Sequence, residues 1–196
     1  CKIQLVMLEL VKQKQLSGDL IVEDIGVGAG TTPVAVIDFL IAWANLCDLY
    51  GAEFPIESVQ MTGADVSRSC LSFAHRTLTA YADAIGERIA IQSKAMIPSG
   101  ILRKAETWTR QACWHEWDLN RFSRNISATS PVLLVASNIL NELNPQGKAH
   151  LADTVLNLPR ESIAIVIEPG ERKRTMQLNR WRKALFQKDN RLIALA

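Results

Sequence analysis

A short apolar run ends in Asp24 and passes directly into a turn with glycine at every second position, at Gly26, Gly28 and Gly30. An apolar run of this length, bounded by turn residues, is typical of a buried parallel strand. The glycines let the backbone turn sharply and remove the Cβ atoms that would keep a ligand away from the main chain. The pattern predicts a ligand-binding strand and turn, and the alternative is an ordinary tight turn.

The residues on either side of this motif predict helices. Thr31 or Thr32 is expected to cap a helix that has Pro33 as its first residue, where the missing N–H costs nothing. Residues 34–50 are apolar on nearly every side, which is typical of a helix packed between a sheet and another layer. Residues 2–16 have the spacing of an amphipathic helix. We therefore expect a leading amphipathic helix (residues 1–18) before the main domain.

The main domain, residues 19–196, alternates strand and helix patterns. A strand at 58–65 also ends in aspartate, and a helix over 68–85 follows it. Residues 86–112 are interpreted as an insertion, in which 89–91 could be strand or helix. This alternation predicts an α/β fold, a mostly parallel sheet with helices on both faces, in the manner of a Rossmann fold. The remaining strand patterns lie at residues 112–118, 132–137, 163–168 and 191–195.

The acid before the glycine turn favours a cationic ligand. A dinucleotide fingerprint counted from Gly26 would have glycine or alanine where Thr31 stands, and Asp24 would repel a pyrophosphate. S-adenosylmethionine carries a sulfonium and an ammonium group and no phosphate. The pattern D-x-G-x-G-x-G, met by residues 24–30, resembles the first motif of class I S-adenosylmethionine-dependent methyltransferases.

This resemblance implies a set of cofactor-binding residues at the strand ends. In that family an acid ending the second strand holds both ribose hydroxyls, and Asp65 with Val66 matches it. An acid ending the third strand lies near the adenine amino group, and Asp118 with Leu119 is the best match. A helix cap is the alternative for Asp65, and a surface acid for Asp118. The residues so implied are Asp24, Gly26, Gly28, Gly30, Thr31, Asp65, Val66, Asp118 and Leu119.

Two later motifs, residues 136–143 and 167–170 with a basic helix after them, narrow the resemblance. They resemble the methyltransferase-like family of the mitochondrial small ribosomal subunit and its bacterial relatives, over most of residues 20–196. Asn138, Asn141 and Glu142 would then face the transferred methyl group, and capping of the next helix is the alternative for Asn141 and Glu142. That family commonly continues into a cysteine-containing segment linked to an iron–sulfur cluster. The printed sequence ends where that segment would begin, so no cluster is assigned, and the presence of a further strand after residues 191–195 is left open.

Charge is unevenly distributed. Residues 160–191 contain nine Lys or Arg and four Asp or Glu, a formal charge of +5, whereas the whole chain carries +2. This excess predicts a contact with RNA or the small ribosomal subunit. The alternative is a solvated helix face with Leu178, Trp181 and Leu185 packed inward.

The cysteine and histidine residues bear on metal binding and on the cellular location. The four cysteines lie far apart, no C-x-x-C pair occurs, and the histidines do not lie at metal-ligand spacing. We expect no metal site and a reducing location, the cytoplasm or, in a eukaryote, the mitochondrial matrix. No uninterrupted apolar run reaches the roughly 18 residues that span a bilayer, so no membrane contact is expected.

The predicted function is that of an S-adenosylmethionine-dependent methyltransferase acting on RNA or a ribosome-associated substrate. A ribosome-assembly or RNA-docking factor that keeps the fold without catalysis is one alternative. A small-molecule methyltransferase is the other.

Overall fold

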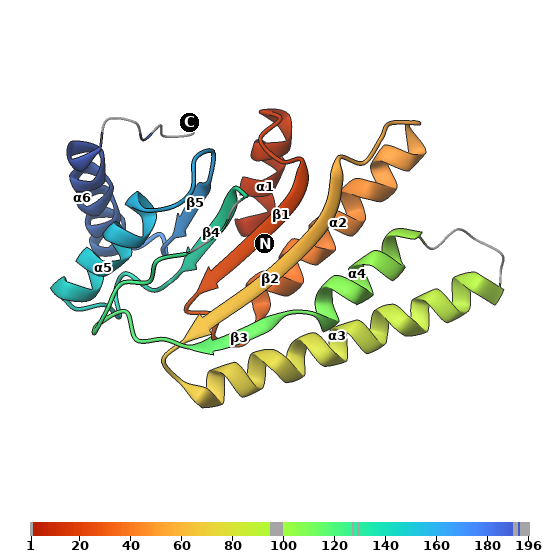
Figure 1. Cartoon of the computed structure of the whole chain (residues 1–196), viewed down its shortest axis with the longest axis horizontal. Coiled ribbons are helices and arrows are strands. Elements are labelled where there is room, and N and C mark those ends of the chain that lie inside the picture. The colour runs from red at the N-terminus through yellow and green to blue at the C-terminus, as the bar shows by residue number, and fades with distance from the viewer. Residues whose placement is uncertain (1, 95–99, 127, 129, 190–191, 193–196) are drawn as a thin grey trace.

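The computed structural model describes residues 2–94, 100–126, 128, 130–189 and 192. Within them, five parallel strands form one sheet in the order β3-β2-β1-β4-β5 (Figure 1). The order reverses between β1 and β4, which is where open α/β sheets bind ligands. The strands are β1 (Gly18–Ile25), β2 (Ile56–Asp65), β3 (Cys113–Glu116), β4 (Val132–Ser137) and β5 (Ile163–Ile167). The helices are α1 (Lys2–Lys12), α2 (Thr31–Leu49), α3 (Arg68–Lys94), α4 (Gly100–Arg110), α5 (Pro145–Leu156) and α6 (Arg172–Lys188).

Helices cover both faces of the sheet. Alternate residues of a strand point to opposite faces, so Val22 and Val135 pack in one cluster with α1, α2, α3 and α4. Ile25 and Leu134 pack in a second cluster with α5 and α6. The predicted α/β fold, with a parallel sheet between helical layers, is confirmed.

Helix α2 begins earlier than predicted. Gly30 is its N-cap residue, with φ of 78° and no side-chain cap. The left-handed backbone at Gly30 turns the chain into the helix at Thr31, so the prediction that Thr31 or Thr32 caps a helix starting at Pro33 is wrong. Helix α2 has the length and apolar composition of a membrane-spanning helix. Its buried side chains, such as Leu40, pack in the core against the sheet, whereas Leu46 and Leu49 near its end are exposed.

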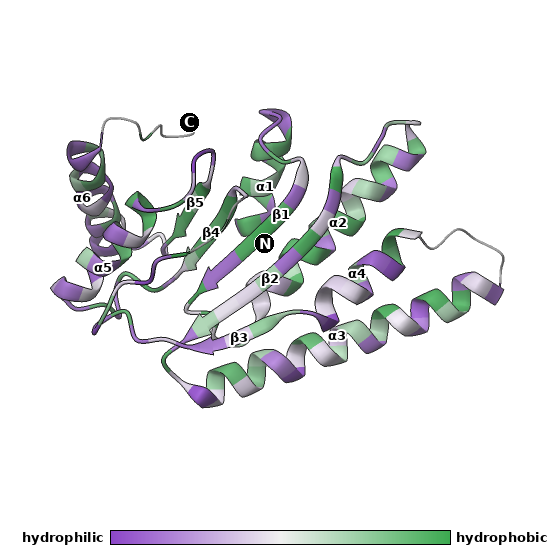
Figure 2. Cartoon of the chain, viewed as in Figure 1, coloured by the Kyte–Doolittle hydropathy of each residue, from purple (hydrophilic) through white to green (hydrophobic). Residues whose placement is uncertain are grey.

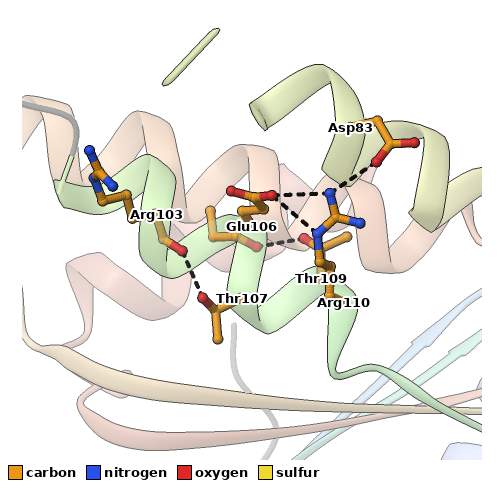
Figure 3. Close-up of polar contacts among 7 residues, drawn as sticks. Asp83, Arg103, Glu106, Thr107, Thr109 and Arg110 are labelled. Carbon is orange, nitrogen blue, oxygen red and sulfur yellow. Dashed lines mark hydrogen bonds and ion pairs between the residues drawn. The ribbon is translucent and has the colours of Figure 1, made fainter. Parts of the chain in front are cut away.

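The described part of the predicted insertion contains the end of α3 and all of α4, and no strand. Helix α3 runs through Gly86 to Lys94 rather than ending near residue 85, because Ile89 continues its buried stripe and tertiary packing outweighs the cost of a glycine. The strand alternative for residues 89–91 is therefore wrong. Helix α4 packs back on α3, where Arg110 bonds both Asp83, at 2.9 Å, and Glu106, at 3.0 Å (Figure 3). The pair with Asp83 joins α4 to α3 and the pair with Glu106 lies within α4, and exposed pairs of this kind contribute little to stability.

Two connections differ from a regular alternation. Residues 117–131, between β3 and β4, have no helix or strand in their described part. The predicted strand at 191–195 lies outside the described residues, apart from Leu192, which is not in a strand. Because all five strands are parallel, their carboxyl ends lie along one edge of the sheet, and a ligand is expected at this edge.

Candidate functional site

The glycine turn is hydrogen-bonded to the end of β2. The carbonyl oxygen of Ala64 accepts from the N–H of Gly26 at 2.8 Å and of Val27 at 3.1 Å. The N–H of Gly28 donates to Oδ2 of Asp65 at 3.1 Å. The turn is therefore held against β2 at its backbone, with the Asp65 carboxylate beside it.

The three glycines of the turn have different surroundings. A Cβ built on Gly30 would lie 3.1 Å from the Cα of Ala74 in α3, and one on Gly26 would lie 3.1 Å from Cδ1 of Ile139. The nearest atom to a Cβ on Gly28 is the Gly26 carbonyl oxygen at 3.9 Å. Gly26 and Gly30 thus permit close packing within the protein, whereas Gly28 borders open space.

Asp24 lies in the central strand, paired with Gly63 of β2 and Val135 of β4. Its side chain is buried, and neither carboxylate oxygen has a hydrogen-bond partner among the residues that the structure describes. Burial first, and then the charges of Glu23 and Asp65, raise the pKa of Asp24 well above its ordinary value. A buried carboxylate without a partner is costly unless a cation or hydrogen-bond donor joins it.

Glu23 points to the opposite face of β1 and is also buried. Its Oε1 lies 2.9 Å from Nη1 of Arg124, yet this oxygen makes no aligned hydrogen bond. Arg124 also lies 5.8 Å from the ring centre of Trp117. Burial raises the pKa of Glu23 from 4.5 to about 7, and the charge of Arg124 opposes the shift only in part.

This pKa shift predicts a pH-dependent stability. Between pH 4.5 and about 7 the unfolded state has lost the Glu23 proton while the folded state retains it, so the contribution of Glu23 to the free energy of unfolding should fall as pH rises. The total loss should be at most about 3–4 kcal/mol, from about 1.4 kcal/mol per pKa unit. Urea denaturation at a series of pH values measures it, and Glu23→Gln should flatten the slope over this interval. An unchanged slope in Glu23→Gln would contradict the prediction.

Asp65 lies at the end of β2, as predicted. Its Oδ1 accepts from the N–H of Ser67 at 2.8 Å, and its Oδ2 accepts from Gly28. Ser67 rather than Asp65 caps α3, because Oγ of Ser67 accepts from the N–H of Cys70 at 3.3 Å. Each carboxylate oxygen of Asp65 keeps a free lone pair, so both can still accept from hydroxyl groups. The neighbouring Val66 is exposed.

Asp118 follows the end of β3, but its carboxylate contacts residues of its own loop. Its Oδ1 accepts from the N–H of Asn120 at 2.9 Å, and its Oδ2 lies 3.1 Å from Nε of Arg121. Leu119 is buried, and its carbonyl oxygen lies 2.7 Å from Nδ1 of His150. The structure therefore places Asp24, the glycine turn and Asp65 together at the carboxyl ends of β1 and β2, while the charge of Asp118 is already partly compensated by Arg121.

Glu168, a residue not predicted for the site, organises the loop after β4. Its buried carboxylate accepts from the N–H of Leu140 at 2.8 Å and from Nδ2 of Asn141. Asn138 is exposed, with φ of 61°, and its N–H donates to the carbonyl oxygen of Ile167 at 2.8 Å. The signal for Glu168 was its place directly after an apolar strand, the same place that drew attention to Asp24.

The alternative that Asn141 and Glu142 cap the next helix is wrong. Asn144 caps α5, because its Oδ1 accepts from the N–H of Gly147 at 2.7 Å. Glu142 is exposed, and so is Thr31 at the start of α2. Asn138, Asn141 and Glu142 thus remain at the carboxyl end of β4, with Asn141 oriented by Glu168.

The basic helix α6 packs one face inward. Leu185 is buried, and Leu178 and Trp181 pack on the same cluster, which confirms the inward packing expected of these three residues. Figure 2 shows hydrophilic residues along much of this helix. The inward packing leaves the cations of α6 on the outside. It is compatible with both interpretations of the excess positive charge, a contact with RNA and a solvated helix face.

No group of three His, Cys, Asp or Glu side chains lies close enough to hold a metal ion within the described part of the chain. In comparisons with known proteins, no family description matches this chain and no curated protein matches it significantly. The function must therefore be argued from the site.

Proposed function

We propose that this protein is an S-adenosylmethionine-dependent methyltransferase acting on RNA or a ribosome-associated substrate. The observation that carries the proposal is Asp24, a buried carboxylate without a partner in the described residues, beside a glycine turn at the switch point of the sheet. A cationic ligand without phosphate suits such a group, and a pyrophosphate does not. This supports the sulfonium compound over a dinucleotide.

The residues present fit the cofactor. Asp24 would hold its cationic end, the open space beside Gly28 lets the ligand approach the backbone, and Asp65 has lone pairs for the ribose hydroxyls. When bound, the cofactor supplies an electrophilic methyl group to an acceptor aligned behind it. The chain's own contribution is alignment and exclusion of water, which needs no catalytic base. Glu168 contributes by orienting Asn141 at the acceptor side.

The surface near the acceptor side favours a polymeric substrate. A small-molecule enzyme would be expected to have a closed apolar pocket near Asn138. The pocket beside Leu140 is instead lined in part by Lys148 and Arg180, and the basic helix α6 forms its wall. RNA-docking without catalysis is a second candidate, supported by the same cations together with the engagement of Asn141 by Glu168.

Calorimetric titration with S-adenosylmethionine tests the proposal. We expect a dissociation constant on the order of micromolar, and Asp65→Ala should weaken binding about ten- to a hundredfold, because it removes charge-assisted acceptors. Asp48→Ala, which removes an exposed aspartate at the far end of α2, is the matched control and should bind as the wild type does. Absence of binding by the wild type, or equal binding by Asp65→Ala, would refute the cofactor assignment.

Transfer of a labelled methyl group separates the two candidate functions. Small-subunit RNA incubated with the protein and labelled cofactor should gain label if the protein is a methyltransferase. Binding of both RNA and cofactor without transfer would favour the docking factor.

A further inference from the structure

A pocket of about 300 Å³ lies between α5 and α6, lined by Leu140, Lys148, Gln177, Arg180 and Trp181. Lys148 is in the first turns of α5, and Leu140 follows the end of β4. Both helices begin at the carboxyl edge of the sheet, and they lie together at one end of the molecule (Figure 1). The pocket therefore belongs to the same edge as Asp24 but is built from different residues.

Gln177, one of the residues that line the pocket, has a buried side-chain oxygen, Oε1, without a hydrogen-bond partner in the described residues. Trp181 is half-buried, and its indole N–H donates to the carbonyl oxygen of Lys148 at 3.1 Å. That bond holds the indole in place at the pocket wall. A ligand that enters the pocket thus meets a fixed aromatic ring and an amide that can complete a hydrogen bond.

The rim of the pocket is positively charged. Neither Lys148 nor Arg180 has an acidic side chain within ion-pair distance in the part of the chain that the structure describes, whereas Arg174 and Lys188 on the same helix do. Cations without intramolecular partners remain available for an anionic ligand. The other Lys and Arg residues of α6 continue this charge along the helix, much of which is hydrophilic in Figure 2.

The combination identifies the ligand class. Aromatic rings stack on unpaired bases, cations contact the phosphates of the backbone, and an amide pairs with a base edge. A free phosphate would leave the tryptophan and the amide unused, and an apolar molecule would leave the cations unused. We propose that the pocket binds one unstacked nucleotide of a single-stranded nucleic acid, with its base against Trp181 and Gln177 and its phosphate at Lys148 and Arg180. Nucleotide binding by the pocket does not depend on the proposed function. Only the idea that this nucleic acid carries the methyl acceptor rests on it.

Fluorescence anisotropy of the whole protein with a labelled single-stranded RNA of about twelve nucleotides tests this proposal. Arg180→Ala and Gln177→Leu should each weaken binding roughly fivefold or more. Arg182→Ala is the matched control, because it removes the same charge from an exposed position of α6 that does not line the pocket. It should weaken binding only about twofold, by loss of general attraction.

Stacking has its own readout. Trp181→Phe keeps a ring and should retain most of the affinity, while Trp181→Ala should lose roughly tenfold. Bound RNA should also quench tryptophan fluorescence in the wild type and less in Trp181→Phe. Thermal melts of each variant distinguish loss of binding from loss of folding, and Gln177→Leu, which keeps an inward side chain of similar size, keeps the test valid if Trp181→Ala does not fold.

Several outcomes decide the proposal. Equal losses in Arg180→Ala and Arg182→Ala, with no effect of Gln177→Leu, would overturn it in favour of general attraction to a basic helix, and so would absence of binding. A DNA oligomer of the same sequence that binds equally well supports the pocket and identifies base and phosphate as the recognised groups; weaker DNA binding supports it and adds the ribose 2′-hydroxyl. Pocket-dependent RNA binding by a protein that does not bind S-adenosylmethionine would leave this inference standing while the proposed function fails.

Discussion

Replacing Asp24 with Asn is expected to weaken S-adenosylmethionine binding strongly and, at neutral pH, to make the ligand-free protein more stable. The carboxylate is buried without a partner in the described residues, and its pKa is raised well above the ordinary 3.8. Folding therefore requires Asp24 to bind a proton or to bury a charge, and Asn requires neither. We therefore expect the free energy of unfolding of Asp24→Asn to exceed that of the wild type at neutral pH. Binding should weaken about a hundredfold or more, because a cation would then enter a buried site without its counterion.

The sign of the pH effect follows from this shift. The unfolded Asp24 ionises near 3.8, while the folded one keeps its proton to higher pH. The stabilisation by Asp24→Asn should therefore be absent below that pH and grow as pH rises. For the same reason the cofactor should bind more tightly as pH rises, with release of a proton, until Asp24 is ionised in the free protein. Calorimetry in buffers of different ionisation enthalpy measures that proton.

Glu23→Gln is the matched control for this prediction. It removes the adjacent buried acid, whose side chain points to the opposite face of the strand. We expect it to stabilise the protein above pH 7 as well, but to leave the affinity for S-adenosylmethionine within about twofold of the wild type. An Asp24→Asn protein that is less stable than the wild type at neutral pH, or that binds the cofactor normally, would contradict the assignment of Asp24.

Gly30→Ala is expected to cause the largest loss of stability in the glycine turn. The backbone has φ of +78°, and the added Cβ would lie 3.1 Å from the Cα of Ala74 and 3.1 Å from Cδ1 of Leu78. Because the first of these atoms belongs to the backbone of α3, the helix itself must shift. The unfavourable φ costs about 1–2 kcal/mol and the overlap about 1–3 kcal/mol more. The sum is a large part of the roughly 5–15 kcal/mol that stabilises a domain.

Substitutions of two other glycines separate the cost of the unfavourable φ from the cost of the overlap. Gly51→Ala has φ of +64° and no atom within 4 Å of the new Cβ, so it should show the conformational cost alone. Gly28→Ala has φ of +52° and little overlap; it should fold with a similar small cost, yet bind S-adenosylmethionine less tightly, because the methyl group occupies the open space beside the turn. Urea denaturation of the three variants measures the differences. Equal losses for Gly30→Ala and Gly51→Ala would show that packing on α3 contributes nothing.

The elements that sequence patterns predicted well are those with local signals. The central strand β1 has an apolar centre at residues 20–22 and is bounded by glycine, so it could be predicted, although its observed end is Ile25, one residue after Asp24. Helix α3 was predicted too short, since Gly86 is a local stop signal while the contacts that carry the helix on to Lys94 come from α4, which follows it. The start of α2 was predicted too late because a left-handed glycine cap competes with a threonine cap.

The sequence by itself determined the general alternation of strands and helices, the glycine turn, and the placing of Asp24, Asp65 and Glu168 at or next to strand ends, because these depend on short-range periodicity and backbone preference. Only the tertiary structure decided which oxygens have partners. Asp24 is left without one in the described residues while Asp65 bonds the turn and Glu168 bonds the loop after β4. It also decided that Gly30 packs on α3 while Gly28 borders open space. Such differences arise from contacts between residues far apart in the chain, which no local pattern encodes.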